Sequence, residues 1–306
     1  MNESRRSWSR RRLLAWCGAG TALSLAGCSG SDPDDQSENG DGDDHANGDG
    51  TSDTHSELAA NFELAGTGAT TYRHWLHPEY QIDADLDVET KQLYQVNDFG
   101  LASAENVTEL VESRQNLALE LGIEPEDFQA EIILGTALSS DPNRVYLGSF
   151  DADAIGSHLQ EYEFERTDDV GEYALFEQDI TIAVGDDAIV THPAYEALIE
   201  AAGGSTDRIE DVDEEVAMLL DVLPDGIITT LARRDGYDSI VVDATVILGT
   251  NDEGRRNHEI RAFVFTDEAQ VSMQTARDVI SGGVFDESDI RREEAHDRVV
   301  MMDVER

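Results

Sequence analysis

The stretch that decides the fold is Ile240-Val241-Val242-Asp243-Ala244-Thr245-Val246-Ile247-Leu248. Its even positions are apolar, and Asp243 and Thr245 alternate with them, which is the period of a strand with one face in a core. A loop around 251–254 separates this strand from a second one, expected over 258–266. Two adjacent strands joined by a short polar loop predict an antiparallel hairpin.

Similar patterns extend outward from this hairpin toward both ends of the chain. Helices are expected at 104–121, after Asp151, and at 193–202, 213–223 and 267–280. Strands are expected at 131–138, 144–150, 161–166, 172–177, 180–184, 188–191, 289–294 and 298–304. Many short strands linked as hairpins, with interspersed helices, predict an α+β fold in which helices pack on one face of a mainly antiparallel sheet.

Two parts of the chain share the expected order strand, helix, strand, strand. The first comprises 145–150, a helix capped by Asp151, 161–166 and 172–177. The second comprises 260–265, a helix capped by Asp267, 289–294 and 298–304. The sequence therefore leaves two arrangements open, one large domain or two similar subdomains built on a duplicated unit.

Residues 1–27 have the organisation of an export signal peptide. Five arginines precede a weakly apolar run over 13–26 that is too short to span a membrane. Arg10 and Arg11, in Ser-Arg-Arg-Arg-Leu-Leu, match the twin-arginine (Tat) signal. The run ends in Leu25-Ala26-Gly27-Cys28, where small residues precede a thiol that can carry a lipid. Signal recognition is thus assigned to Arg10 and Arg11, and lipidation to Cys28.

The segment that follows, 28–65, is expected to be a disordered acidic tether. Residues 29–57 hold ten acidic residues and no Lys or Arg, with hardly an apolar side chain. A flexible chain of this length spans roughly 30 Å. The folded part is expected over 66–306. It contains no cysteine, because Cys17 and Cys28 are the two in the chain, which excludes a disulfide or a cysteine metal site there.

The charge of the chain is extreme. Its 66 acidic and 21 basic residues give a net charge of −45, and removal of five Arg and one Glu with residues 1–27 leaves −49. Lys91 is the only lysine. Acids spread over the whole chain indicate adaptation to high salt, where their repulsion is screened. The same charge argues against nucleic-acid binding, which requires a basic surface.

Taken together, the chain resembles uncharacterised haloarchaeal Tat-exported lipoproteins. The leader and acidic tether match them, as do Trp75-Leu76 and Leu147-Gly148-Ser149-Phe150-Asp151. The resemblance implies a halophilic protein held at the cell membrane by lipid on Cys28, with its domain on the extracellular face. It carries over no active site.

Two arrangements in the folded part suggest chemistry at first sight. His74, His77 and Glu79 have the spacing of metal ligands on a helix, but Pro78 disfavours a continuous helix there. Ser149 lies in a tight turn without the flanking glycines of a nucleophile elbow, so a strand end followed by a helix cap explains it better. We therefore assign no catalytic residue, metal ligand or cofactor.

Two further features concern the surface. Tyr72, Trp75 and Tyr80 form an aromatic concentration that either lines a ligand groove or seals the start of the core. Asn106, in Asn106-Val107-Thr108, is a glycosylation sequon whose expected place in a first helical turn argues against ready access.

These observations favour a non-enzymatic, lipid-anchored binding domain that takes an unidentified envelope protein or ligand. A surface hydrolase using dispersed carboxylates or a metal is one alternative. A solute-binding lipoprotein is another, and it would show two lobes with parallel sheets around a cleft.

Overall fold

The computed structural model describes residues 62, 72–77, 90–105, 107–135, 143–234, 239–250, 256–281 and 287–306. Arg10, Arg11, Cys28 and Asn106 lie outside these ranges, as do residues 1–27, expected to be a signal peptide, and nearly all of the expected tether. In the described part, no helix is both long and apolar enough to cross a membrane.

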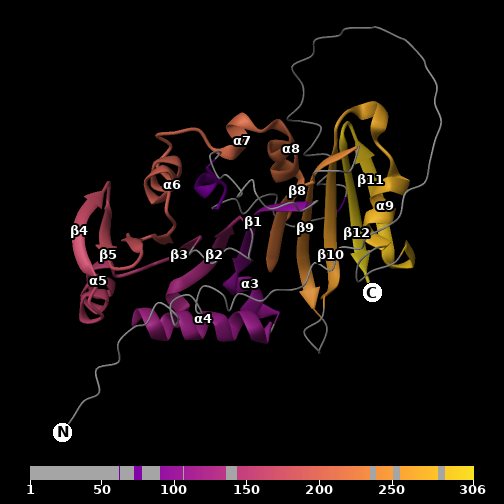
Figure 1. The fold of residues 1–306 in the computed structure, drawn as a ribbon. Coiled ribbons are helices and arrows are strands. Elements are labelled where there is room, and N and C mark those ends of the chain that lie inside the picture. The colour runs from indigo at the N-terminus through magenta and orange to yellow at the C-terminus, as the bar shows by residue number, and fades with distance from the viewer. Residues whose placement is uncertain are drawn as a thin grey trace.

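The described residues form one twelve-stranded sheet with helices on its faces (Figure 1). The strands are β1 (Thr90–Asp98), β2 (Phe128–Leu134), β3 (Arg144–Gly148), β4 (Glu165–Val170), β5 (Tyr173–Glu177), β6 (Thr181–Val184), β7 (Ala188–Thr191), β8 (Ile228–Arg234), β9 (Ile240–Thr250), β10 (Arg256–Phe265), β11 (Ile290–His296) and β12 (Val299–Glu305). The helices are α3 (Phe99–Ala104), α4 (Thr108–Leu121), α5 (Ala152–Glu161), α6 (Tyr195–Ala202), α7 (Ile209–Val212), α8 (Glu214–Val222) and α9 (Met273–Ser281), and the 3₁₀ turns include η1 (Arg73–Trp75).

Every strand pair in this sheet is antiparallel, which confirms the predicted α+β class. The order across the sheet is β11-β12-β10-β9-β8-β1-β2-β3-β7-β6-β5-β4. Two meanders, β1-β2-β3 and β8-β9-β10, therefore lie side by side at its centre and meet at the β1–β8 pair.

Each meander is followed in the chain by a helix and a hairpin, as the predicted repeat requires. The placement of the hairpins differs. Strand β12 pairs directly with β10, whereas β6 and β7 lie between β5 and β3. The two halves thus share an order of elements but not a pattern of strand pairing.

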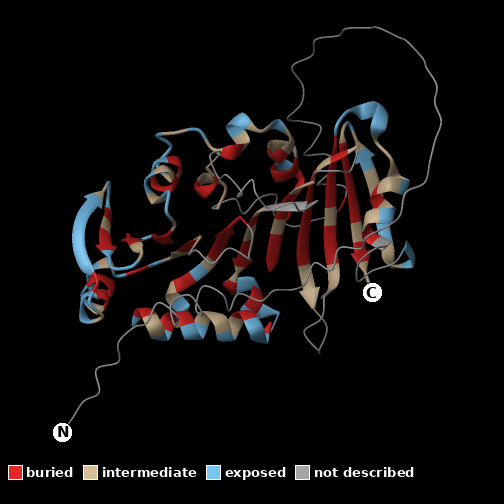
Figure 2. Cartoon of the chain, in the orientation of Figure 1, coloured by how far each residue is buried: buried red, intermediate tan, exposed pale blue. Residues whose placement is uncertain are grey.

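The expectation that the helices cover one face was wrong, since they cover both (Figure 1). Along β10, Ala262 and Val264 pack into the core shared with α8, whereas Phe263 and Phe265 pack against α9. In β3, likewise, Val145 belongs to the core shared with α6 and α8, whereas Tyr146 packs on the opposite face with α4 and α5. The central strands are consequently buried from both sides (Figure 2).

The strand that decides the fold is therefore buried on both faces instead of one. Val242, Ala244 and Val246 lie in the core shared with α8, and Asp243 and Thr245 on the other face are 5% and 7% exposed. Arg234 makes a two-point hydrogen bond to Asp243, with nitrogen–oxygen distances of 2.7 and 3.1 Å. A buried carboxylate needs such a partner.

A second buried polar network crosses β1, β2 and β3 on that same face. The side-chain amide of Asn97 donates to Glu131 at 2.8 Å, and Arg144 forms an ion pair with the same carboxylate. Gln95 donates to Asn97 at 2.9 Å. Polar groups thus occupy strand positions that would otherwise be apolar.

The core also reaches back to Phe62, four residues before the expected start of the folded domain at residue 66. Phe62 is 7% exposed and belongs to the core shared with α8. The guanidinium carbon of Arg292, on β11, lies 5.2 Å from its ring centroid. That distance is typical of a cation–π contact. The chain is therefore held at the β11 edge of the sheet before it reaches η1.

Candidate functional site

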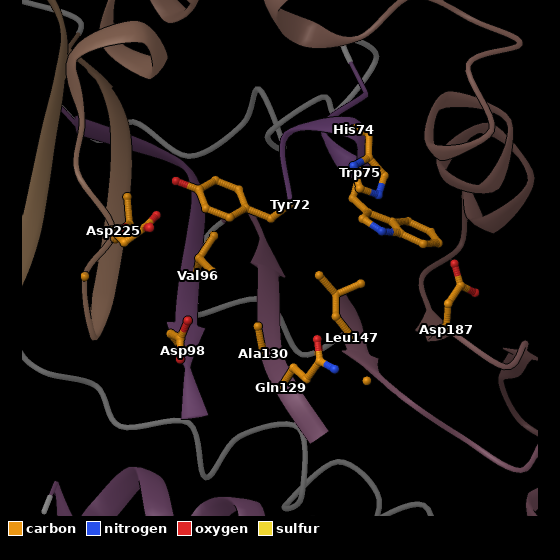
Figure 3. A pocket seen from close by; sticks show the side chains of 13 residues that line it. Tyr72, His74, Trp75, Val96, Asp98, Gln129, Ala130, Leu147, Asp187 and Asp225 are labelled. Atoms are coloured by element: carbon orange, nitrogen blue, oxygen red, sulfur yellow. The ribbon is translucent and has the colours of Figure 1, made fainter. Parts of the chain in front are cut away.

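A cavity of about 200 Å³ lies between η1 and the central strands (Figure 3). Tyr72, His74 and Trp75 form its roof, and Val96, Ala130 and Leu147, one from each strand of the first meander, form its floor. Its other lining residues are Asp98, Gln129, Gly148, Asp187, Asp225, Gly226 and Thr229. Residues far apart in the chain thus meet around one hollow.

The roof is fixed in place by backbone and ring contacts. The turn closes through a hydrogen bond from the Trp75 amide to the Tyr72 carbonyl at 3.0 Å. The amide of Ile209, at the start of α7, donates to the Leu76 carbonyl at 2.7 Å. Trp75 is 1% exposed and packs edge-on against Tyr173, with ring centroids 6.2 Å apart. The roof is therefore part of the folded core.

Two glycines allow the backbone to come close at the cavity walls. A Cβ atom on Gly148 would lie 2.1 Å from the carbonyl oxygen of Asp127. A Cβ atom on Gly226 would lie 2.2 Å from Val246 Cγ1. Both distances are far below van der Waals contact, so larger residues would displace the walls.

Three carboxylates reach the cavity from separate elements. Asp98 ends β1 and accepts a hydrogen bond from the Leu101 amide at 2.8 Å, which caps α3. Asp187 lies in the β6–β7 turn and accepts from the Tyr173 hydroxyl at 2.5 Å. Asp225 precedes β8 and lies at the hydroxyl end of Tyr72 (Figure 3). The cavity therefore carries concentrated negative charge.

One basic neighbour of these groups, Arg73, is turned away from the cavity. Arg73, between two residues of the roof, pairs instead with Asp221 at 3.1 Å and Glu210 at 3.5 Å. Among the described residues, no Lys or Arg side chain lines the cavity. The negative charge is thus not neutralised from within the lining.

The pKa values of two roof residues are shifted by burial. Burial, and then the charge of Arg208, lower the pKa of His74 below its usual value, against an opposing effect of Asp187. Burial raises the pKa of Tyr72 to about 12, and Asp225 contributes in the same direction. Near neutral pH both side chains are therefore uncharged, and the Tyr72 oxygen is hydrogen-bonded to Thr229.

The aromatic concentration seen in the sequence lies at the start of the core and beside the cavity. Trp75 is buried in the core, and Trp75 and Tyr72 line the cavity. Tyr80 lies outside the described residues. Of the expected metal-ligand spacing, His74 lies in the roof, His77 is described, and Glu79 is not. In the described ranges, no three His, Cys, Asp or Glu side chains are grouped to hold a metal ion.

The turn at Ser149 is the predicted junction of strand and helix. Strand β3 ends at Gly148, and Asp151 caps α5 by accepting from the Ala154 amide at 2.9 Å. A nucleophilic Ser149 would need a histidine partner, and the two nearest in sequence on either side of β4–β7 make other hydrogen bonds. His158 bonds the Glu120 carbonyl at 2.9 Å, and His192 accepts from the Ala194 amide at 2.9 Å.

Sequence reasoning missed the three carboxylates of the cavity. Asp98 had no predicted strand before it, because β1 itself was missed. Asp187 lies between two expected strands, 180–184 and 188–191, where an acidic residue is ordinary in a turn. The Pro224-Asp225-Gly226 turn was not singled out, although its glycine marks a close backbone approach. Only the three-dimensional fold brings these side chains together.

No family model matches the chain, and no curated protein does. Two solved structures are similar over most of its length, crystal forms I and III of TP0453. Form I has a TM-score of 0.41 and 6% identity, covering 78% of this chain and 94% of that one. Form III has a TM-score of 0.38 and 8% identity, covering 76% and 92%. Likeness at this level says nothing about a ligand or an activity.

Proposed function

We propose that this chain is a lipid-anchored binding protein on the extracellular face of a halophilic archaeon's cell membrane. In this proposal the cavity beneath η1 is its ligand site. The observation that carries it is the construction of the cavity. Its aromatic, carboxylate and amide groups come from separate segments, and glycines at 148 and 226 allow their close approach. Concave, mostly preformed sites with a few polar groups are typical of ligand binding.

The proposed location at the membrane is based on the expected signal peptide and lipidation site. Arg10 and Arg11 would direct export of the folded chain, and lipid on Cys28 would retain it at the membrane. Replacing Cys28 with Ser should release the protein into the medium or leave it uncleaved. Unchanged, detergent-requiring membrane retention of the Cys28→Ser chain would contradict the anchoring.

Ligand binding is tested by thermal-shift screening of the full Cys28→Ser chain in molar potassium chloride. A true ligand should raise the melting temperature of this chain but not that of one that also carries Ala130→Phe, because the added ring fills the cavity floor. Ala154→Phe, the same change on the exposed surface of α5, is the matched control. If no compound stabilises the protein, or if Ala130→Phe leaves the shift intact, the site is wrongly assigned.

Activity assays and the strand topology address the alternative functions. Turnover of an ester, phosphate, peptide or glycan in molar salt would favour the surface hydrolase. One continuous antiparallel sheet in the described residues differs from the two parallel-sheet lobes expected of a transporter's solute-binding lipoprotein. The binding domain is therefore the function we favour.

A further inference from the structure

The chemistry of the cavity lining restricts what it can hold. Asp98, Asp187 and Asp225 place carboxylates around a hollow to which the described chain contributes no Lys or Arg side chain. An anionic ligand would face uncompensated repulsion and desolvation there. A cation would offset both. The excess of carboxylates over basic side chains in the lining therefore favours a positively charged ligand.

The arrangement of the carboxylates separates an organic cation from a metal ion. Asp225 lies beside the hydroxyl end of Tyr72, and Asp187 lies on the opposite side, beyond the Trp75 ring (Figure 3). Within the described part of the chain, no three potential ligands converge on one point. A hard metal ion such as calcium needs six to eight converging oxygens. A larger ligand, whose charge is spread over several atoms, fits the separation better.

The aromatic and apolar walls indicate the same class independently of charge. Tyr72 and Trp75 cover the cavity from above, and Val96, Ala130 and Leu147 form an apolar floor. Aromatic rings attract ammonium groups, and substituted ammonium ions carry methyl groups that pack on apolar walls. A hydrated inorganic cation gains little from such a surface.

The size of the cavity sets the size of the ligand. A cavity of about 200 Å³ suits a compact ligand better than a long one. We infer that the cavity selects a compact organic cation, an ammonium group bearing small apolar substituents, held beneath η1 beside the Tyr72 ring and the three carboxylates. This inference rests on the proposed function, because it names the ligand class of the same site.

The test compares choline with its neutral isostere 3,3-dimethylbutan-1-ol by calorimetric titration of the full Cys28→Ser chain. The buffer is cacodylate with molar potassium chloride, which contains no amine and does not precipitate calcium. Choline should bind saturably, and the neutral isostere about tenfold or more weakly, because it lacks the charge that the rings and carboxylates attract. Glucose and calcium ions are titrated in parallel and should show no binding.

Variants locate the binding. Asp187→Asn and Asp225→Asn should each weaken choline binding about threefold to tenfold and leave the affinity of the neutral isostere unchanged. Asp186→Asn is the matched control, since Asp186 is exposed in the same turn and does not line the cavity. Each variant is first shown to melt cooperatively at the temperature of the parent chain, so that a lost fold is not mistaken for a lost site.

The outcomes separate the inference from the proposal beneath it. Equal binding of choline and its isostere, or binding of glucose alone, overturns the cationic ligand but keeps the cavity as a binding site. Binding of calcium alone that depends on Asp187 and Asp225 overturns it in favour of a metal. If no probe binds and the broader thermal-shift screen finds no ligand, the proposed function fails as well.

Discussion

Gly148 holds the floor of the cavity against the turn that carries Asp127. Replacing Gly148 with Ala would place a Cβ atom 2.1 Å from the Asp127 carbonyl oxygen and 2.5 Å from the Phe150 ring. Backbone must then move, so we expect a loss of about 1–3 kcal/mol in the free energy of unfolding. Urea denaturation in molar salt measures it. Gly203→Ala, whose Cβ would meet its nearest atom at 3.4 Å, should leave stability nearly unchanged.

His192 gives the protein a specific acid sensitivity. Burial lowers its pKa to about 4, whereas the unfolded side chain titrates near 6.5. Between these values the unfolded state binds more protons, so stability falls as the pH falls. Wild type should therefore lose up to about 2–3 kcal/mol more than His192→Asn between pH 6.5 and 4.5.

The variant keeps an acceptor near the Ala194 amide but cannot titrate. Both proteins contain the same carboxylates, so the contribution of the carboxylates to the pH dependence of stability cancels in the comparison. Denaturation at the two pH values measures the difference, and parallel pH slopes for the two proteins would rule out this role of His192.

Single residues also show where sequence reasoning succeeds. Asp151 and Asp213 were expected at helix starts, and their side chains accept from the Ala154 and Val216 amides. Gly122 ends α4 in the left-handed conformation, directly after the expected helix end at 121. Such caps depend on neighbours within four residues and can be predicted locally. The cavity carboxylates depend on neighbours far away in the chain, and no local pattern marks them.

Strands β1 and β8 were missed for a reason that the elements themselves supply. One face of each strand carries polar residues that are paired inside the protein, such as Asn97 in β1 and Arg234 in β8. In β1 the alternation of apolar and polar residues is limited to 94–97, and in β8 the polar pairs at 229–230 and 233–234 interrupt it, so neither strand shows a run as long as that at 240–248. The strand expected at 161–166 begins later than predicted. Helix α5 continues to Glu161, and β4 begins at Glu165. The sequence therefore predicted that a helix and a strand occur here, but not the residues at which they end and begin.

Removing one partner from the buried polar network between β1, β2 and β3 should lower the free energy of unfolding. The Glu131 carboxylate is 5% exposed. After Arg144→Leu it would keep the hydrogen bond from the Asn97 amide but lose its ion-pair partner. We expect a loss of about 3–5 kcal/mol, measured by urea denaturation.

A second change should rescue the first. The double variant Glu131→Gln, Arg144→Leu removes the stranded charge and should recover most of that stability. The exposed pair of Arg166 and Asp169 is the control, and Arg166→Ala should have no measurable effect. A double variant no more stable than Arg144→Leu would show that packing, not charge, dominates at this site.

At the scale of the whole molecule, charge repulsion should make folding depend on salt. The net charge of −45 repels itself over about 10 Å at 0.1 M salt but only about 3 Å at 1 M. The melting temperature of the full Cys28→Ser chain should therefore rise steeply between these concentrations of potassium chloride. Calorimetry at several concentrations measures it, and a flat profile would contradict adaptation to high salt.

The global arrangement was predictable in class but not in layering. Hairpins along the chain specify an antiparallel sheet, because each turn fixes its own pair. Nothing local specifies that β1 and β8 join two meanders into one sheet, or that helices cover both faces. Those features follow from apolar residues on both sides of the central strands, such as Ala262 and Phe263 in β10.

Phe62 has a mechanical consequence for the cavity. It is packed against Arg292 at the β11 edge, and four strands separate that edge from β1. Ten residues later the chain reaches Tyr72, in the cavity roof. Tension applied upstream of residue 62 would pass straight into that roof if Phe62 were free. Because Phe62 is packed against the sheet, a pull from upstream would act first on its contact with Arg292 in the edge hairpin.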